Sequence, residues 1–391
     1  MIRQLQIPAA FWAAIAMTGI ANAAQLSLDA NRNFLQQNLV VASAADINNP
    51  YFRVPASTWS GAAGLIVNTD QLDSAGFVTT CSATLVSSRV LLTAAHCIDA
   101  ADLNRVRVRF GSASSTSGGT FTEYEASHVW VNPDWTGNVG SNDIAALYLD
   151  EDAAASFDRY GIYRGNGEFG QIHTKVGFGS TGEGTGGTNN AIGGRSKRAG
   201  QNIYEASGDQ VFSDVGNDVL LYDFDSGFSQ NDVFGVLGLP QTGVYRRLTD
   251  GLLFAGIPAN ENPADYQLVE ANSSPGDSGG GTFIGSLLAG ITSFGITGSI
   301  IDGACGPGQI DPDSNRFPGA DSSSTPVSAA CTNSSFGELS GDTRVSSFAG
   351  LIDSLMQTQG MFSAIPAPGM LALFSLGVAG LFRTRRQRKP L

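Results

Sequence analysis

The segment Arg105-Val106-Arg107-Val108-Arg109-Phe110 alternates basic and apolar residues over its whole length. Because successive side chains of a β-strand point to opposite faces, this alternation predicts a strand with one face in a core. Short runs of β-forming residues recur on both sides of it; they are Ala63–Val67, Val78–Val86, Val90–Ala94, His128–Val131, Ile144–Leu149, Lys175–Phe178, Val219–Phe224, Thr282–Ile284, Leu287–Phe294 and Thr343–Val345. Together with 49 glycines, many short strands predict an all-β antiparallel barrel or sandwich.

Helix signals are scarce until the end of this region. Phe348, Leu351, Ile352, Leu355 and Met356 then follow helical spacing. They predict one amphipathic helix whose apolar stripe docks on the β body. The glycine-rich stretch 177–200, which ends in Arg195, Lys197 and Arg198, predicts a long, mobile surface loop that is open to proteolytic nicking.

Both ends of the chain resemble targeting segments. Arg3, the apolar run Ile7–Ile20 and Ala21-Asn22-Ala23 predict a signal peptide over 1–23, with a buried N-terminal helix as the alternative. Residues 24–53 are polar and predict a leader or propeptide. At the other end, 359–391 form a linker and an apolar run, Gly369–Phe382, that leads into five basic residues. This run predicts a membrane stop, although it is shorter than the roughly 20 residues of a full span.

Charge excludes one class of partner. The terminal segments hold six of the 22 basic residues and no acids, so the remainder carries 16 basic against 35 acidic residues. A surface this acidic repels nucleic acid, and we expect no nucleic-acid partner. Membrane contact is expected only through the C-terminal segment.

Four cysteines in an exported chain predict two disulfides, which can pair in three ways. Spacing favours Cys81–Cys97 and Cys305–Cys331, because short loops close at the lowest entropic cost. Metal binding is the alternative, but no C-x-x-C spacing supports it. No metal or cofactor is predicted.

Three segments carry the residue types of nucleophilic catalysis. His96 lies at the end of an apolar run, Asp143 opens another, and Ser278 lies in the glycine-rich stretch Pro275–Gly281. A serine hydroxyl needs an adjacent base, and a buried carboxylate holds a histidine in the tautomer that serves as that base. The glycines let the backbone turn so that the N–H groups of Gly276 and Ser278 converge on a developing oxyanion.

Taken together, Thr93–Cys97, Asp143–Leu147 and Gly276–Gly280 resemble the three signature blocks of chymotrypsin/trypsin-like serine proteases, in that family's His…Asp…Ser order. Subtilisin-type and α/β-hydrolase enzymes order these residues differently. The resemblance implies a peptidase domain over 54–358, built of two six-stranded antiparallel β-barrels with a C-terminal helix. The active site would lie between the barrels, with His96, Asp143 and Ser278 as its catalytic residues.

The resemblance also implies roles for neighbouring residues. The spacing of Cys81 and Cys97 is similar to the family's histidine-loop disulfide. Ser293, Phe294 and Gly295 resemble the strand that pairs with the substrate backbone.

Asn272 stands at the position of the base of the specificity pocket, where a trypsin has aspartate, so cleavage after Arg or Lys is not implied. Ser274 replaces a cysteine that many relatives have. The segment between Gly179 and Ser278 is longer than in compact relatives. It includes Leu221–Asp225, which we interpret as a strand with an acidic turn rather than a calcium site.

Activation by cleavage is a further implication. In zymogen-activated members, the aspartate before the serine pairs with a new N-terminal amine, and Asp277 holds that position. Arg53-Val54 lies 27 residues before Cys81, close to the family's spacing for the cleaved bond, although Pro55 replaces the usual Gly-Gly pattern.

The C-terminal segment has a resemblance of its own. Ile365–Gly369, the apolar run and the arginine-rich end are similar to PEP-CTERM sorting signals, with Ala367 in place of glutamate. This implies an exosortase-type processing partner and the surface of a Gram-negative bacterium. A plain tail anchor is the alternative.

The expected function is a secreted or surface-sorted serine endopeptidase that cleaves protein or peptide substrates through an acyl-enzyme. Two alternatives stay open: a surface binding protein on an inactive protease fold, and a hydrolase that acts on esters only.

Overall fold

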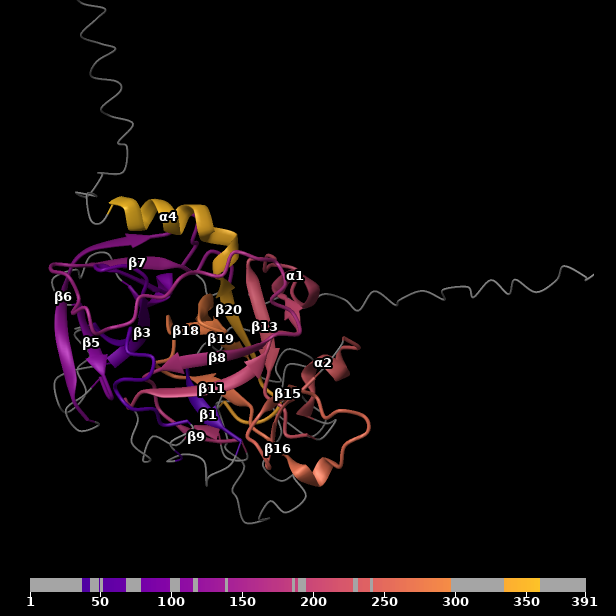
Figure 1. The fold of residues 1–391 in the computed structure, drawn as a ribbon. Helices are drawn as coiled ribbons and strands as arrows, with labels where there is room; N and C mark the ends of the chain where they lie inside the picture. Colours follow the sequence, from indigo (N-terminus) through magenta and orange to yellow (C-terminus); the bar gives the residue numbers. More distant parts are fainter. Residues whose placement is uncertain are drawn as a thin grey trace, which may run out of the picture.

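The computed structural model describes residues 37–42, 49, 52–67, 79–98, 106–114, 119–137, 140–184, 187–188, 195–227, 231–239, 242–296 and 334–358. Two β units lie side by side, and helix α4 (Ala349–Thr358) lies along one edge of the body (Figure 1). Both terminal segments, 1–36 and 359–391, fall outside the described residues, as do Cys305 and Cys331.

The first unit is a closed barrel of six antiparallel strands. In barrel order these are β2 (Ala62–Val67), β3 (Thr79–Leu85), β4 (Val90–Thr93), β7 (Ala145–Leu149), β6 (Phe121–Val131) and β5 (Val106–Gly111). On β5 the valines of the alternating segment are buried. Its outward arginines form ion pairs with the residues directly opposite on β6, Arg107 with Glu125 at 3.0 Å and Arg109 with Glu123 at 2.6 Å. The strand predicted from the alternation is confirmed.

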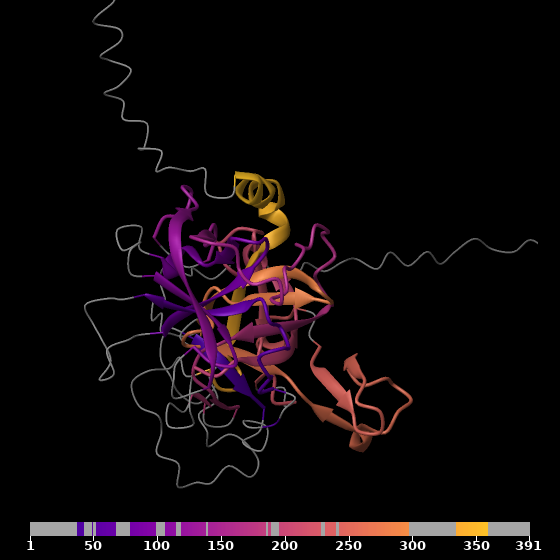
Figure 2. The same cartoon turned by 60° about the vertical axis from the view of Figure 1, so that its left-hand side comes forward.

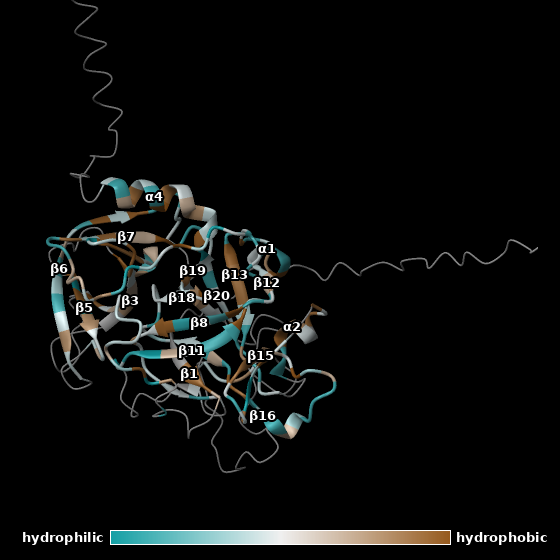
Figure 3. Ribbon diagram, viewed as in Figure 1, coloured by the Kyte–Doolittle hydropathy of each residue, from teal (hydrophilic) through white to brown (hydrophobic). Residues whose placement is uncertain are grey.

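The second unit is a seven-stranded sheet that forms a half-barrel. Its strand order is β11 (Arg198–Ile203), β8 (Ile172–Gly177), β18 (Gly281–Ile284), β19 (Leu287–Ile296), β20 (Leu339–Arg344), β13 (Val219–Asp223) and β12 (Ala206–Ser207). All residues of β7 and β13 are buried, and Figure 3 shows their hydrophobic character. The predicted all-β class is confirmed, with one closed barrel and one half-barrel.

The interior of the half-barrel contains a buried ion pair. Lys175 Nζ lies 2.6 Å from Asp342 Oδ1, and the Tyr204 hydroxyl donates to the other oxygen of that carboxylate at 2.6 Å. Both charged side chains are almost completely shielded from solvent. Because removal of one partner would leave an uncompensated charge, this pair constrains how β8 and β20 pack together.

Two smaller sheets accompany the seven-stranded sheet of this unit. One comprises β15 (Leu253–Ala255), β14 (Val244–Arg247) and β16 (Tyr266–Leu268), and it extends away from the body (Figure 2). The other comprises β10 (Gly187–Thr188), β9 (Gly182–Glu183), β1 (Gln37–Val41) and β17 (Ala271–Ser274). The short helices are α1 (Gly208–Val211) and α2 (Val233–Val236).

The predicted C-terminal helix is confirmed as α4. Ile352 and Leu355 are buried, while Leu351 and Met356 pack at the margin of the first core. The Tyr148 hydroxyl of β7 donates to the Leu355 carbonyl at 3.3 Å, which ties the helix to the barrel. Among the described residues, no helix combines the length and apolar character that crossing a membrane requires.

Two segments differ from the sequence-based expectation. Strand β1 lies within the polar stretch 24–53, where its Val40 and Val41 are fully buried. The glycine-rich stretch 177–200 is not a loop throughout, because Gly177 ends β8, Arg198 begins β11, and Lys197 and Arg198 are buried. Lys197 Nζ donates to the carbonyls of Ala56 and Trp59 at 2.9 and 3.3 Å.

Candidate active site

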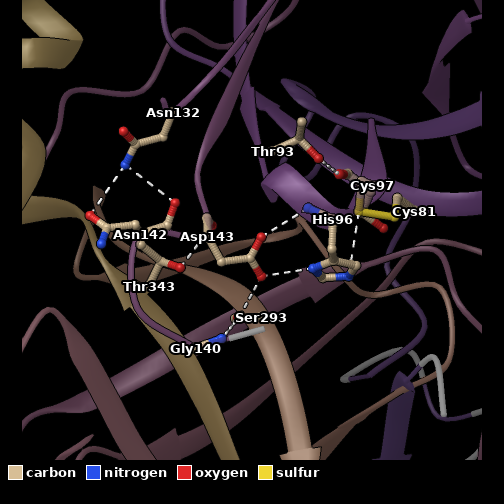
Figure 4. Close-up of polar contacts among 11 residues, drawn as sticks. Cys81, Thr93, His96, Cys97, Asn132, Gly140, Asn142, Asp143, Ser293 and Thr343 are labelled. Atoms are coloured by element: carbon tan, nitrogen blue, oxygen red, sulfur yellow. Dashed lines mark hydrogen bonds and ion pairs between the residues drawn. A yellow bond between two sulfur atoms is a disulfide. The ribbon is translucent and has the colours of Figure 1, made fainter. Parts of the chain in front are cut away.

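His96 and Asp143 meet because the strands beside them pair. Thr93 at the end of β4 lies opposite Ala145 at the start of β7. A 3₁₀ turn over Ala95–Cys97 follows β4, and Asp143 precedes β7 by two residues. His96 Nδ1 lies 2.7 Å from Asp143 Oδ2, and the His96 backbone N–H donates to Asp143 Oδ1 at 2.9 Å (Figure 4).

Asp143 is fully buried, so its charge must be balanced by hydrogen bonds. Besides the two from His96, the Ser293 hydroxyl donates to Oδ2 at 2.5 Å. Thr343 Oγ1 donates to the Asp143 carbonyl at 2.8 Å. Ser293 belongs to β19 and Thr343 to β20, so the half-barrel holds an aspartate that the first barrel supplies (Figure 4).

The protonation of His96 is set by two opposing effects. Burial lowers the pKa of His96, but the charge of Asp143 and the hydrogen bond to it outweigh burial, so the pKa lies above its ordinary value. With Nδ1 directed at the carboxylate, the neutral ring carries its proton there, and Nε2 is the nitrogen that can accept another. This is the arrangement of a general base.

The predicted disulfide between Cys81 and Cys97 is confirmed and lies beside His96. It joins β3 to the turn that carries the histidine. Because Cys97 follows His96 directly, the disulfide limits how far the imidazole can move relative to β3.

Ser278 lies in the turn between β17 and β18, and it is 3% exposed. Gly276 and Gly279 on either side have φ angles of 104° and 77°, which favour glycine. A Cβ on Gly279 would lie 2.0 Å from Thr93 Oγ1 and 2.9 Å from the Ala94 nitrogen. Any side chain at position 279 would collide with the end of β4, so glycine is required there. The contacted residue Thr93 lies three residues before His96.

Ser82 fastens this turn to β3. Its N–H donates to the Ser278 carbonyl at 2.7 Å, and its hydroxyl donates to the Gly276 carbonyl at 2.8 Å. Ser82 is the neighbour of Cys81, and Cys97 is the neighbour of His96. The Ser278 turn is therefore linked to the histidine through the Ser82 hydrogen bonds and the Cys81–Cys97 disulfide. Within the described residues, however, the Ser278 hydroxyl and His96 make no hydrogen bond to each other.

The backbone N–H groups of the serine turn differ in whether they donate a hydrogen bond within the turn. The Asp277 N–H donates to the Ser274 carbonyl at 3.2 Å and so closes the turn. In the described part of the chain, the flanking N–H groups of Gly276 and Ser278 donate to no carbonyl. Two amides without a backbone acceptor, one on each side of Asp277, are available to an incoming oxygen.

Asp277 itself points inward and is buried. Its carboxylate accepts from the N–H groups of Gly179 at 3.2 Å and Ser274 at 3.4 Å. Burial raises the pKa of Asp277 to about 7, against the hydrogen bond from Gly179 and the charges of Lys175 and Arg198. Among the described residues, no side chain forms an ion pair with Asp277, and Lys175, the nearby cation that lowers its pKa most, is itself paired with Asp342.

The predicted cleavage site lies near this carboxylate. Arg53 is exposed and bridges to Arg198, which pairs with Gly177 in the adjoining ladder. A Cβ on Gly177 would lie 1.8 Å from Asp277 Oδ1. Only β11 thus lies between Arg53 and β8, the strand that packs directly on Asp277. The side chain of Val54, the next residue, is part of the first core.

Two of the residues predicted to bind substrate, Asn272 and Gly295, lie next to Ser340 of β20. Asn272 Oδ1 accepts from the Ser340 hydroxyl at 2.7 Å, and Gly295 pairs with Ser340 across β19 and β20. Asn272 is buried, and its side-chain nitrogen has no hydrogen-bond partner among the described residues. No charged side chain takes part in this arrangement. Phe294 is 3% exposed and packs against Phe212 in the second core.

Ser293 makes a contact with Asp143 that the sequence pattern does not predict. It was assigned to substrate binding, but its hydroxyl is engaged with Asp143. The sequence marks Ser293 only as part of the block Ser293–Gly295. Its contact with Asp143 joins residues 150 positions apart and depends on how the two units pack together.

Comparison with known proteins agrees with this picture over part of the chain. The family model described as Trypsin matches residues 63–202. Over 78 residues the chain is 33% identical to "Trypsin, alkaline B" of Manduca sexta, covering 20% of this chain and 30% of that protein. Over 77 residues it is 35% identical to "Serine protease Hayan" of Drosophila melanogaster, covering 19% of this chain and 12% of that protein.

The chain thus spans less than a third of the length of either curated relative that it matches. His96 and Asp143 lie inside the matched range, whereas Ser278 lies beyond it. The family match, the two relatives and the barrel architecture together support a trypsin-like serine protease domain in this chain.

Proposed function

We propose that this protein is an exported serine endopeptidase with Ser278 as nucleophile, His96 as general base and Asp143 as the residue that orients the base. The observation that carries the proposal is the buried His96–Asp143 hydrogen bond, which directs Nδ1 to the carboxylate and so leaves Nε2, 3.8 Å from Cys97 Sγ, as the nitrogen that can accept a proton. Nucleophile, base and orienting carboxylate are the three parts that acyl transfer by serine requires.

The proposed reaction begins when the Ser278 hydroxyl gives its proton to His96 Nε2 while Oγ bonds to the carbonyl carbon of the substrate. The carbonyl oxygen gains negative charge and accepts hydrogen bonds from the amides of Gly276 and Ser278. His96 then returns the proton to the leaving amine as the C–N bond breaks. Water repeats the sequence on the acyl-enzyme, and the acid product and free Ser278 result.

Covalent labelling tests this assignment. A fluorophosphonate probe should label the mature wild-type protein at Ser278, and S278A should remove the label. S286A is the matched control, because Ser286 is exposed in the turn between β18 and β19. Labelling that survives S278A would refute the proposed nucleophile.

The absence of a Ser278–His96 hydrogen bond within the described residues is the one observation that favours an inactive binding protein on this fold. Catalytic hydrogen bonds often tighten only when substrate is bound, and the peptidase assignment predicts that the Ser278–His96 hydrogen bond forms at that point. Casein turnover that H96A abolishes would support the peptidase. Binding of casein without turnover would support the alternative, and cleavage of esters alone would support the ester hydrolase.

Activation by cleavage after Arg53 is part of the proposal. The amine of Val54 would pair with Asp277, whose buried carboxylate has no ionic partner among the described residues. Pairing a buried carboxylate with a cation removes the main cost of its burial. N-terminal sequencing of the active form should begin at Val54, and any other N-terminus would contradict this step.

The proposed specificity is for an uncharged residue before the cleaved bond. Asn272 and Ser340 offer only neutral polar groups where a trypsin has a carboxylate. A lysine or arginine side chain would therefore gain no ion pair there. Cleavage of a peptide library by the mature enzyme tests this, and a preference for Arg or Lys would overturn it.

Export and sorting complete the proposal. We propose removal of residues 1–23 as a signal peptide and processing of 359–391 by an exosortase-type enzyme at the surface of a Gram-negative bacterium. Both segments lie outside the described residues. Intact mass of the protein recovered from the cell surface tests both cleavages, and a full-length mass would contradict them.

A further inference from the structure

Three aspartates in the long insertion of the second unit face one another below the surface. Asp223 ends β13, Asp225 follows two residues later, and Asp232 precedes α2. Each offers a carboxylate oxygen, and these oxygens lie within 4.8 Å of one another. All three side chains are buried. This separation is small enough for one cation to contact all three.

Backbone groups hold two of these carboxylates in place. Asp223 Oδ2 accepts from the Val233 N–H at 2.7 Å, and Asp232 Oδ1 accepts from the Gly235 N–H at 2.5 Å. In each of these two carboxylates, one oxygen is thus held by a backbone N–H group. Positioning of this kind reduces the entropy lost when a ligand binds.

Asp225 supplies the independent sign of a missing partner. It is 7% exposed, and its Oδ1 has no hydrogen-bond partner among the described residues. A buried anionic oxygen without a partner is costly. Asp225 Oδ1 therefore lacks a partner of the kind that a bound cation would supply.

Two further carboxylates surround the aspartates, and no basic side chain of the described residues forms an ion pair with any of the five. Glu205 makes a side-chain contact with Asp223. Glu270 is fully buried and accepts from the N–H groups of Asp225 at 2.8 Å and Val244 at 2.9 Å. The cluster has an excess of negative charge that only a bound cation or bound protons can offset.

From these contacts we propose that Asp223, Asp225 and Asp232 bind a divalent calcium ion. Calcium accepts six to eight oxygen ligands in flexible geometry, which suits carboxylates drawn from a strand end, a turn and a helix start. Magnesium demands a near-octahedral shell and retains several waters, which a buried cluster of this kind accommodates less readily. Thiolate-preferring metals are excluded by the all-oxygen donor set.

The site would connect the insertion to the substrate-binding region. Glu270 holds the Asp225 backbone and directly precedes β17, the strand that carries Asn272. Calcium bound beside Asp225 would offset the repulsion on Glu270 and so secure the start of β17. This step rests on the proposed protease function, whereas metal binding itself does not.

Calorimetric titration of chelator-treated protein tests the site. S278A is a suitable background because it prevents self-cleavage. One calcium ion per chain should bind, with magnesium at least tenfold weaker. D225N should weaken calcium binding by at least tenfold. D250N is the matched control, since Asp250 lies in the same insertion but is exposed and paired with Arg247, and it should bind like the parent.

The change in Tm on adding calcium distinguishes loss of the metal site from a general loss of stability in the variant. Calcium at about 100 times its Kd should raise the Tm of the parent by about 5 °C, and it should not raise the Tm of D225N. In chelator, D225N should melt at about the same temperature as the parent, because Asp225 Oδ1 has no hydrogen-bond partner among the described residues that the change could remove.

Several results would overturn the proposal. They are no heat of calcium binding, equal affinity for calcium and magnesium, unchanged binding in D225N, or a D225N melting point that is lower than the parent's by the same amount with and without calcium. If calcium binds but the fluorophosphonate does not label Ser278, the metal site stands and the protease assignment fails.

Discussion

Ser293 Oγ and His96 Nδ1 share one acceptor, Oδ2 of Asp143, at 2.5 and 2.7 Å. A serine on β19 of the second unit therefore helps to fix the carboxylate that orients the histidine of the first unit. The two halves of the candidate site are joined by this hydrogen bond, and its removal should affect chemistry more than substrate binding.

S293A tests that relationship. Loss of a hydrogen bond to a buried charged group costs about 1.5–3 kcal/mol, so kcat should fall by about 10- to 100-fold. KM should change little if Ser293 acts through Asp143. Steady-state kinetics on a peptide substrate provide the measurement, with S286A as control. A rise in KM at unchanged kcat would indicate substrate contact instead.

D143N should reduce kcat by about 10⁴-fold, the effect of the same change in the general template of the serine protease triad. The charge of Asp143 helps to raise the pKa of His96, so its loss should lower that pKa. Because the base acts in its neutral form, the acid limb of the pH–rate profile should move to lower pH. A residual activity with an unmoved acid limb would argue against His96 as the base.

D277N should stabilise the uncleaved chain at alkaline pH. The folded pKa of Asp277 is about 7, above the ordinary value of about 4, so the folded chain binds more protons than the unfolded chain between these values. Stability of the uncleaved wild type therefore falls as pH rises through this window. The advantage of D277N should grow with pH and reach at most about 4 kcal/mol above pH 8.

Urea unfolding in the S278A background measures this difference at pH 5 and pH 8. D150N, which removes an exposed acid at the end of β7, is the control. An advantage of D277N that is equal at both pH values would contradict the prediction. In the cleaved enzyme, D277N should instead abolish activity, because the Val54 amine would lose its partner.

G279A and G350A should act in opposite directions. A Cβ on Gly279 would lie 2.0 Å from Thr93 Oγ1 and 2.5 Å from the Ser82 carbonyl oxygen, at a φ of 77°. We expect a loss of about 2–4 kcal/mol in the free energy of unfolding, together with loss of labelling at Ser278. Gly350 lies in α4 with nothing within 4 Å of its Cβ, so alanine there should add about 0.5–1 kcal/mol. Chemical denaturation of both variants provides the comparison.

Features that depend on neighbouring residues could be predicted from the sequence. The alternation in Arg105–Phe110 gave the correct strand, the stripe from Phe348 to Met356 gave the correct helix, and the spacing of Cys81 and Cys97 gave the correct disulfide. Each of these predictions uses only the periodicity or the spacing of residues within one short segment, so it does not require knowledge of distant parts of the chain.

Features that depend on long-range pairing could not be predicted. Lys197 is buried because carbonyls about 140 residues earlier accept its hydrogen bonds, and nothing in the local glycine-rich sequence shows this. Asp223 and Asp232 are brought together by the path of the chain between β13 and α2. The roles of His96, Asp143 and Ser278 in catalysis stay predictions, as do the cleavage after Arg53 and the targeting segments.

Strand β1 has a consequence for a protein cut after Arg53. Its Val40 and Val41 are fully buried, and it pairs with β17 and β9. Residues 37–53 contain no cysteine, so no disulfide could hold this segment to the rest of the protein after the cut. The activated enzyme would be a non-covalent heterodimer of a short leader peptide and a large catalytic chain. Dilution alone could then dissociate the peptide, and the order of the strand that carries Asn272 would depend on protein concentration.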